Sequence, residues 1–95
     1  MAEFDTAREP RGADDCFALG MMLSSGAGAP IDLVQAHKWF NIAAARGHRD
    51  AVRLRREIAE QMSDGEIGRA QRAARDWLQA HPIVAAPRES TRIAA

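Results

Sequence analysis

Apolar residues recur with the period of an α-helix in four stretches of the chain, between residues 13 and 80. In the first stretch, small and apolar residues lie at positions i, i+3, i+4 and i+7: Cys16, Leu19, Gly20 and Leu23. These positions share one face of a helix with 3.6 residues per turn. The pattern therefore predicts a first helix that begins near Ala13 and turns this face toward a core.

The second stretch follows a loop that favours a sharp reversal of the chain. Gly26 and Gly28 interrupt the first pattern, because glycine readily adopts the left-handed conformation that ends a helix. Asp32 then offers a side-chain acceptor to the free amides of a second helix, which Gly47 ends. Its apolar stripe combines large rings with alanines: Ala36, Trp39, Phe40, Ala43 and Ala44. The two helices are predicted to pair as an antiparallel hairpin.

Two further helices are predicted in the second half of the chain. Asp50 favours the start of a third helix, whose inward positions are Ala51, Leu54, Ile58 and Met62. Ser63 and Glu66 have the spacing of a capping box, which starts a fourth helix. The apolar face of the fourth helix comprises Ile67, Ala70, Ala74, Trp77 and Leu78. Pro82 disfavours helical geometry at His81, so the fourth helix should end there.

The predicted organisation is one helical domain between two flexible ends. Residues 1–12 and 81–95 lack a clear apolar period, which predicts a flexible N-terminal arm and a flexible C-terminal tail. Residues 13–80 are predicted to form an all-α domain of about four helices in two pairs. The pairs should stack side by side, because a single hairpin cannot cover its own apolar face.

A specific set of residues spans the first hairpin: Phe17, Ala18, Leu19, Gly20, Gly26, Gly28, Pro30, Asp32, Ala36, Trp39, Phe40, Ala43, Ala44 and Gly47. This set resembles the Sel1-like repeat, a relative of the tetratricopeptide repeat. The resemblance implies a right-handed solenoid fragment of α-α hairpins, with residues 13–47 as the clear repeat and residues 48–80 as a degenerate capping pair. The chain departs from the family pattern at Asp15, Met22 and Ala29, where alanine, an aromatic residue and valine are usual.

Charge and cysteine content exclude several classes of protein. The chain has 13 basic and 13 acidic residues, so its net charge gives no bulk attraction to nucleic acid or to an anionic membrane. Cys16 is the only cysteine, which excludes an intramolecular disulfide and a zinc site with two thiolates. No stretch approaches the roughly 18 apolar residues of a membrane span. These features predict a soluble, cytoplasmic protein.

The sequence predicts no catalytic residue, no metal site and no cofactor. His37, His48 and His81 are widely spaced, and no local arrangement pairs a nucleophile with a base and an orienting carboxylate. His48 and Asp50 resemble a pair of metal ligands, but two such residues at the start of a helix are common by chance. Cys16 is expected to pack as a small apolar group. The chain is therefore interpreted as a non-enzymatic protein.

The resemblance implies an adaptor or scaffold that binds a peptide or a partner protein on the surface of the repeats. Phe17 and Met21 lie beside the core stripe of the first helix, and Arg53 and Glu57 are their counterparts on the third helix. We expect Phe17 and Met21 to supply an apolar anchor and Arg53 and Glu57 to add charge-assisted bonds. The alternative is that Phe17 and Met21 complete the core or a self-association surface.

Nucleic-acid binding is the alternative function, because arginines are concentrated in the middle and second half: Arg46, Arg49, Arg53, Arg55, Arg56, Arg69, Arg72 and Arg75. Acidic residues are interspersed among these arginines. They predict ion pairs on the helix surface between residues three or four positions apart, which disfavours nucleic-acid binding. The core is expected to be thin, so the sequence also predicts that residual apolar surface is covered in a homodimer.

Overall fold

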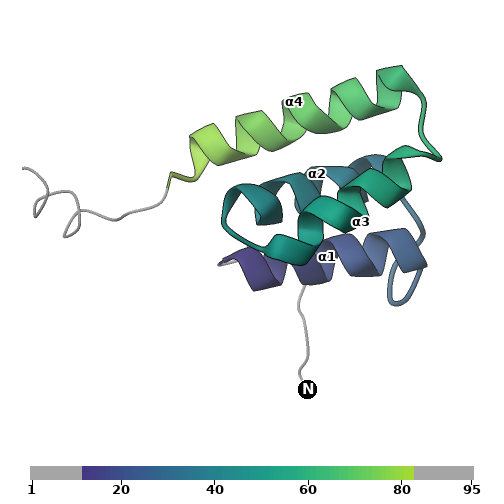
Figure 1. Cartoon of the computed structure of the whole chain (residues 1–95), viewed down its shortest axis with the longest axis horizontal. Coiled ribbons are helices and arrows are strands. Elements are labelled where there is room, and N and C mark those ends of the chain that lie inside the picture. Colours follow the sequence, from purple (N-terminus) through teal and green to yellow (C-terminus); the bar gives the residue numbers. More distant parts are fainter. Residues whose placement is uncertain (1–11, 83–95) are drawn as a thin grey trace, which may run out of the picture.

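The computed structural model describes residues 12–82, which form four α-helices and no strand. The helices are α1 (Ala13–Ser25), α2 (Leu33–Ala45), α3 (Arg49–Ala59) and α4 (Asp64–Ala80), as labelled in Figure 1. The prediction of an all-α domain with four helices is confirmed for residues 12–82. The predicted arm and tail lie outside the described residues, apart from Gly12, His81 and Pro82.

Helices α1 and α2 approach each other closely at Gly20. A β-carbon placed on Gly20 would lie 2.5 Å from Cε1 of Phe40, which is closer than real β-carbons come to another atom. The ring of Phe40 therefore occupies the space that any other residue at position 20 would fill. Glycine inside a helix costs about 0.5 to 1 kcal/mol relative to alanine, and burial of the Phe40 ring offsets this cost.

The turn between α1 and α2 has the local structure that its residues predict. Gly26 and Gly28 have φ values of 83° and 93°, in the left-handed region that favours glycine. The turn closes with a hydrogen bond from the Asp32 amide to the carbonyl oxygen of Leu23, at 2.9 Å. Oδ1 of Asp32 accepts a hydrogen bond from the amide of Gln35 at 3.1 Å. Asp32 is thus the N-cap of α2, as predicted.

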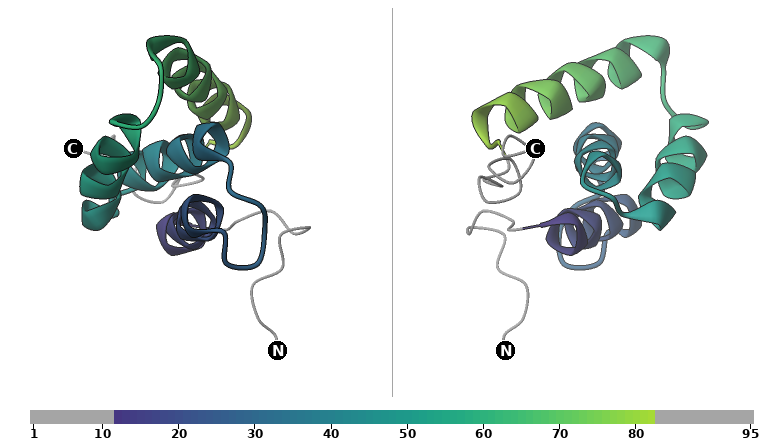
Figure 2. Two further views of the ribbon diagram at one scale, coloured as in Figure 1. Left: turned by 90° about the vertical axis from the view of Figure 1, so that its right-hand side faces the viewer. Right: turned by 60° about the vertical axis from the view of Figure 1, so that its left-hand side comes forward.

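Helix α2 lies at the centre of the molecule and packs against the other three helices. The right-hand view of Figure 2 shows α4, α3 and α1 on three sides of α2. Two residues of α2 are buried although they lie outside the apolar stripe expected from the sequence: Ile42 and His37. That stripe was expected on one face only. A helix covered on three sides buries more of its circumference, so the prediction missed both residues.

The second helix pair differs from the expected closed hairpin. The capping box of α4 is present, because the Glu66 amide donates to Oγ of Ser63 and the Ser63 amide donates to Oε1 of Glu66. However, α3 and α4 both pack on α2 and make little direct contact with each other. Figure 1 shows α4 crossing above α2, with α3 separate from it. Met62 lies after the end of α3 and packs against the core from the connecting segment.

No helix in the described part of the chain is both long enough and apolar enough to cross a membrane.

Candidate functional site

Phe17, one of the predicted partner-binding residues, packs against the core. Its ring stacks on the ring of His48 with a centroid distance of 3.9 Å and an interplanar angle of 13°. It also lies 5.6 Å from the ring of Phe40. His48 is the N-cap residue of α3, so this stack joins α1 to the start of α3. Phe17 is therefore occupied by contacts within the chain.

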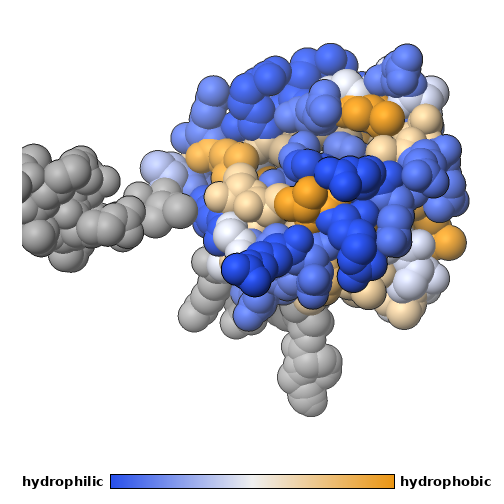
Figure 3. Space-filling view, in the orientation of Figure 1, coloured by the Kyte–Doolittle hydropathy of each residue, from blue (hydrophilic) through white to orange (hydrophobic). Residues whose placement is uncertain are grey.

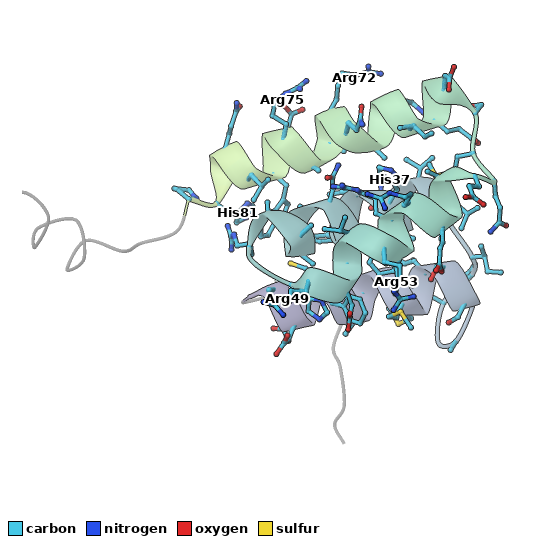
Figure 4. The ribbon with its side chains drawn as sticks, in the orientation of Figure 1. His37, Arg49, Arg53, Arg72, Arg75 and His81 are labelled. Carbon is cyan, nitrogen blue, oxygen red and sulfur yellow. The ribbon has the colours of Figure 1, made fainter. Side chains whose placement is uncertain are left out.

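The other three predicted site residues lie at the surface. Met21 on α1 is 42% exposed. Arg53 and Glu57 lie one turn apart on α3, and their side chains form an ion pair with each other at 3.2 Å. Figure 4 labels Arg53 on this helix. None of the four predicted residues lines the cavity that α2 and α4 form together.

The cavity between α2 and α4 is an open groove with a volume of about 370 Å³. Its walls are formed by Asn41, Ala45, Gln71, Ala74, Arg75, Leu78 and Gln79. Asn41 also binds Arg55 of α3, which places the groove on the flank of α4 that faces α3. In Figure 3, apolar residues lie below the largely hydrophilic upper edge that α4 forms. The groove exists because α3 and α4 pack on α2 and not on each other.

The polar side chains that line the groove are the amides of Asn41, Gln71 and Gln79 and the guanidinium of Arg75. Nη1 of Arg55 reaches from α3 and donates a hydrogen bond to Oδ1 of Asn41 at 2.6 Å. Arg75 of α4 is exposed at the rim, and Gln71 and Gln79 lie on the same helix. None of the lining residues, all within 12–82, carries a carboxylate. The lining therefore combines the one positive charge of Arg75 with neutral hydrogen-bonding groups and apolar side chains.

His37 lies one helical turn before Asn41 on α2 and is only 3% exposed. Figure 4 shows His37 between α3 and α4. Burial lowers the pKa of His37 below its usual value, and the positive charge of Arg55 lowers it further. Nδ1 of His37 has no hydrogen-bond partner within the described chain. The imidazole is accordingly neutral at pH 7.

A cluster of rings and one arginine holds the last turn of α4 against α2. Trp39 and Trp77 meet edge to face at 5.4 Å, and His81 stacks on Trp77 at 4.0 Å. The guanidinium of Arg46 lies 5.3 Å from the centre of the Trp77 ring and donates to the carbonyl oxygen of His81. Together these contacts hold α4, which forms one wall of the groove, against α2. The sequence interpretation treated Arg46 as a surface residue and missed this role.

The predicted pairing of surface arginines with acids is confirmed at Arg53 alone. Arg55 binds an amide and Arg46 binds a backbone carbonyl. Five others are exposed and form no ion pair in the part of the chain that the structure describes: Arg49, Arg56, Arg69, Arg72 and Arg75. One reason is that the carboxylate of Glu66, three residues before Arg69, is bound in the capping box.

Among residues 12–82, no group of three His, Cys, Asp or Glu side chains is placed to hold a metal ion. Cys16 is fully buried, as predicted, and burial raises the pKa of its thiol to about 11. A protonated, inaccessible thiol is a poor nucleophile.

Comparison of the chain with protein-family models, with curated proteins and with solved structures found no match. The resemblance of residues 13–47 to the Sel1-like repeat therefore stays a prediction from the residues alone.

Proposed function

We propose that this chain is a non-enzymatic protein-interaction module, an adaptor or scaffold, that binds a peptide segment of a partner protein in the groove between α2 and α4. The observation that carries the proposal is the composition of the groove. Apolar side chains of Ala45, Ala74 and Leu78 lie beside the amides of Asn41 and Gln71. Side-chain amides both donate and accept hydrogen bonds, so they match the N–H and C=O groups of a peptide backbone.

The alternative surface near Phe17 and Arg53 is a weaker candidate for the same function. The Phe17 ring is stacked on His48, and the Arg53 guanidinium is paired with Glu57. A partner would have to break these contacts before it could use either residue. The groove on α4 requires no such rearrangement, because Gln71 and Arg75 are already exposed. The Sel1-like resemblance supports the general class of repeat-surface interaction.

The proposal is tested by selecting peptides from a random display library on the full chain and mapping them by NMR. We expect the selected peptides to shift the backbone amides of Asn41, Ala45 and Leu78. Ala45 is exposed on the groove, so Ala45→Phe should fill it and weaken binding about tenfold or more. Ala18→Phe places the same ring on the exposed surface of α1 and serves as the control.

Two results would contradict this function. Selected peptides could shift amides of α1 alone, or they could bind the Ala45→Phe variant as tightly as the unaltered chain. Thermal melts of both phenylalanine variants should match that of the unaltered chain, because both positions are exposed.

Nucleic-acid binding is a second candidate function, favoured by the exposed arginines of α3 and α4 that form no ion pair. Arg72 and Arg75 lie on the outer side of α4, and Arg49 lies on α3 (Figure 4). A 20-base-pair DNA duplex and a single-stranded RNA of the same length are suitable probes. Affinity that falls steeply with added salt would support this candidate. Absence of binding at low salt would eliminate it.

A further inference from the structure

We infer that the exposed face of α1 is a self-association surface, on which two copies of this chain pair their α1 helices in an antiparallel arrangement. The face consists of Ala18, Met21 and Ser25, which share one side of the helix, and of Ile31 in the loop that follows. It is separate from the groove that α2 and α4 form, so the inference does not rest on the proposed function.

The rest of the chain leaves this face of α1 uncovered. Helix α1 packs chiefly on α2, so its opposite side meets solvent. Met21 and Ile31 are 42% and 61% exposed, and no other large apolar side chain in residues 12–82 is exposed to this degree. A β-carbon on Gly26 would lie 3.1 Å from Cγ1 of Ile31, so Ile31 packs beside the end of α1. Both exposed side chains therefore lie at the C-terminal half of α1.

Burial of this half of α1 would cost little, because its hydroxyl groups already have partners. Oγ of Ser24 donates a hydrogen bond to the carbonyl oxygen of Met21 at 3.2 Å. Oγ of Ser25 donates to the carbonyl oxygen of Met22 and accepts a hydrogen bond from the amide of Ala27. A polar group that keeps its hydrogen bonds loses little when water is removed from it. The face can therefore meet an apolar surface without leaving a side-chain donor unpaired.

The absence of charge favours a second copy of the chain as the occupant. Residues 16–31 contain no charged side chain, so an acidic or basic partner would find no opposite charge there. In a pair with twofold symmetry, each copy presents the same patch to the other, and a patch with charges of one sign would repel itself. An uncharged face avoids this repulsion. The small side chains of Ala18 and Ser25 also allow two helices to approach closely.

Asp14 favours the antiparallel direction of pairing. It lies two turns before Met21 on the same side of α1, and its side chain is 98% exposed. Parallel α1 helices would place the two Asp14 carboxylates side by side, where they repel each other. Antiparallel helices that cross near Met21 place these carboxylates at opposite ends of the contact.

A dimer formed through α1 would leave the groove of each copy open. None of the residues that line the groove belongs to α1, and α1 and α4 lie on different sides of α2 (Figure 2). Helix α1 has 13 residues, so the contact is small. Interfaces below about 1,200 Å² are weak and transient, and we expect a dissociation constant on the order of 100 µM. The dimer would present two grooves to a partner that carries two binding segments.

Sedimentation equilibrium of the full chain, from about 10 µM to about 1 mM, tests this pairing. The apparent mass should rise from that of a monomer toward that of a dimer. Met21→Glu should weaken the pairing about tenfold or more, because it places two carboxylates where the helices cross. Ala80→Glu adds the same charge to an exposed position at the end of α4 and should leave the pairing unchanged.

Thermal melts at low concentration should match for the unaltered chain and both glutamate variants, because Met21 and Ala80 are exposed. A mass that stays at the monomer value up to about 1 mM would overturn the inference. Equal weakening by the two variants would also overturn it.

Cross-linking with a short bis-maleimide then locates the contact. Cys16 is the only natural cysteine and is fully buried, so an engineered cysteine is the one accessible thiol. Met21→Cys should form covalent dimers in high yield, whereas Asp14→Cys and Ala80→Cys should form few. Dimers formed chiefly by Asp14→Cys would indicate parallel helices, and dimers formed chiefly by Ala80→Cys would indicate a contact elsewhere. Either result contradicts the inference.

Discussion

Helix α2 is joined to α1 and to α4 by two interfaces of different construction. At the interface with α1, the Phe40 ring fills the space above Gly20, so helix backbone and ring are in direct contact. At the interface with α4, buried Ala70 and Ala74 form the centre, and the tryptophan pair with Arg46 closes one flank only. The other flank is the groove. The comparison shows that a ring placed over a glycine closes an interface, whereas rings gathered along one edge leave the opposite edge open.

The largest effect is expected from filling the closed interface with Gly20→Leu. A side chain at this position meets the Phe40 ring at once, so α1 and α2 must separate or Phe40 must leave the core. We expect a loss of about 3 kcal/mol or more in the free energy of unfolding, measured by urea denaturation. An unchanged denaturation midpoint would show that the two helices do not pack in this way.

A smaller loss is expected at the open interface from Trp77→Ala. Trp77 is half-buried and contacts Trp39, His81 and Arg46, so its removal should cost about 2 kcal/mol, less than for a fully buried tryptophan. The variant should also lose peptide binding, because α4 is no longer held in place. NMR spectra should show shifted amides in α4 and preserved amides in α1. Equal disturbance of both helices would contradict the division between the two interfaces.

The buried imidazole of His37 on α2 should make stability depend on pH. Because burial and Arg55 lower the pKa of His37 in the folded chain, the unfolded chain binds a proton more readily. The contribution of this residue to stability is therefore complete above the usual histidine pKa of about 6.5 and is lost as the pH falls below it. Urea midpoints at pH 7.5 and 5.5 should differ less for His37→Gln than for the unaltered chain. An identical difference would exclude His37 as the cause.

The smallest effect is expected from Gly68→Ala in α4, which is the counterpart of the Gly20 substitution. A β-carbon at Gly68 would lie 3.4 Å from Nη1 of Arg72, the mobile end of a long side chain. The helix should therefore gain about 0.5 to 1 kcal/mol from the higher helix propensity of alanine. Differential scanning calorimetry should detect a small rise in melting temperature. A fall would indicate that Arg72 is held more firmly over Gly68 than its exposure suggests.

The starts of α2 and α4 could be predicted because the signals for them are local, whereas α3 ends at Ala59, before the predicted inward position Met62. Asp32 and Ser63 cap the helices that follow them, and each cap involves residues no more than three positions away. Gly20 is also a signal that can be recognised in the sequence, since a glycine inside a helix implies a close neighbour. These signals specify where a helix starts and which face it buries.

The groove could not be predicted because it depends on which helix α4 packs against. A capping box fixes the start of α4 but not its partner, and the sequence was taken to indicate a closed pair with α3. Phe17 was expected in a binding surface, but the ring of His48 from another element covers it. The absence of ion pairs at several arginines was also not predicted. Glu66 lies three residues before Arg69, but its carboxylate accepts a hydrogen bond in the capping box and does not pair with Arg69.

The central position of α2 has a consequence for how the groove admits a partner. Because α3 and α4 meet α2 separately and barely touch, α4 can shift relative to α3 without disturbing the packing between α1 and α2. Its end near His81 is held by Arg46 and Trp39, whereas its start is joined to α3 by a short connection. We therefore expect that a tilt of α4 on α2 would change the width of the groove and the size of the aliphatic side chain that it admits.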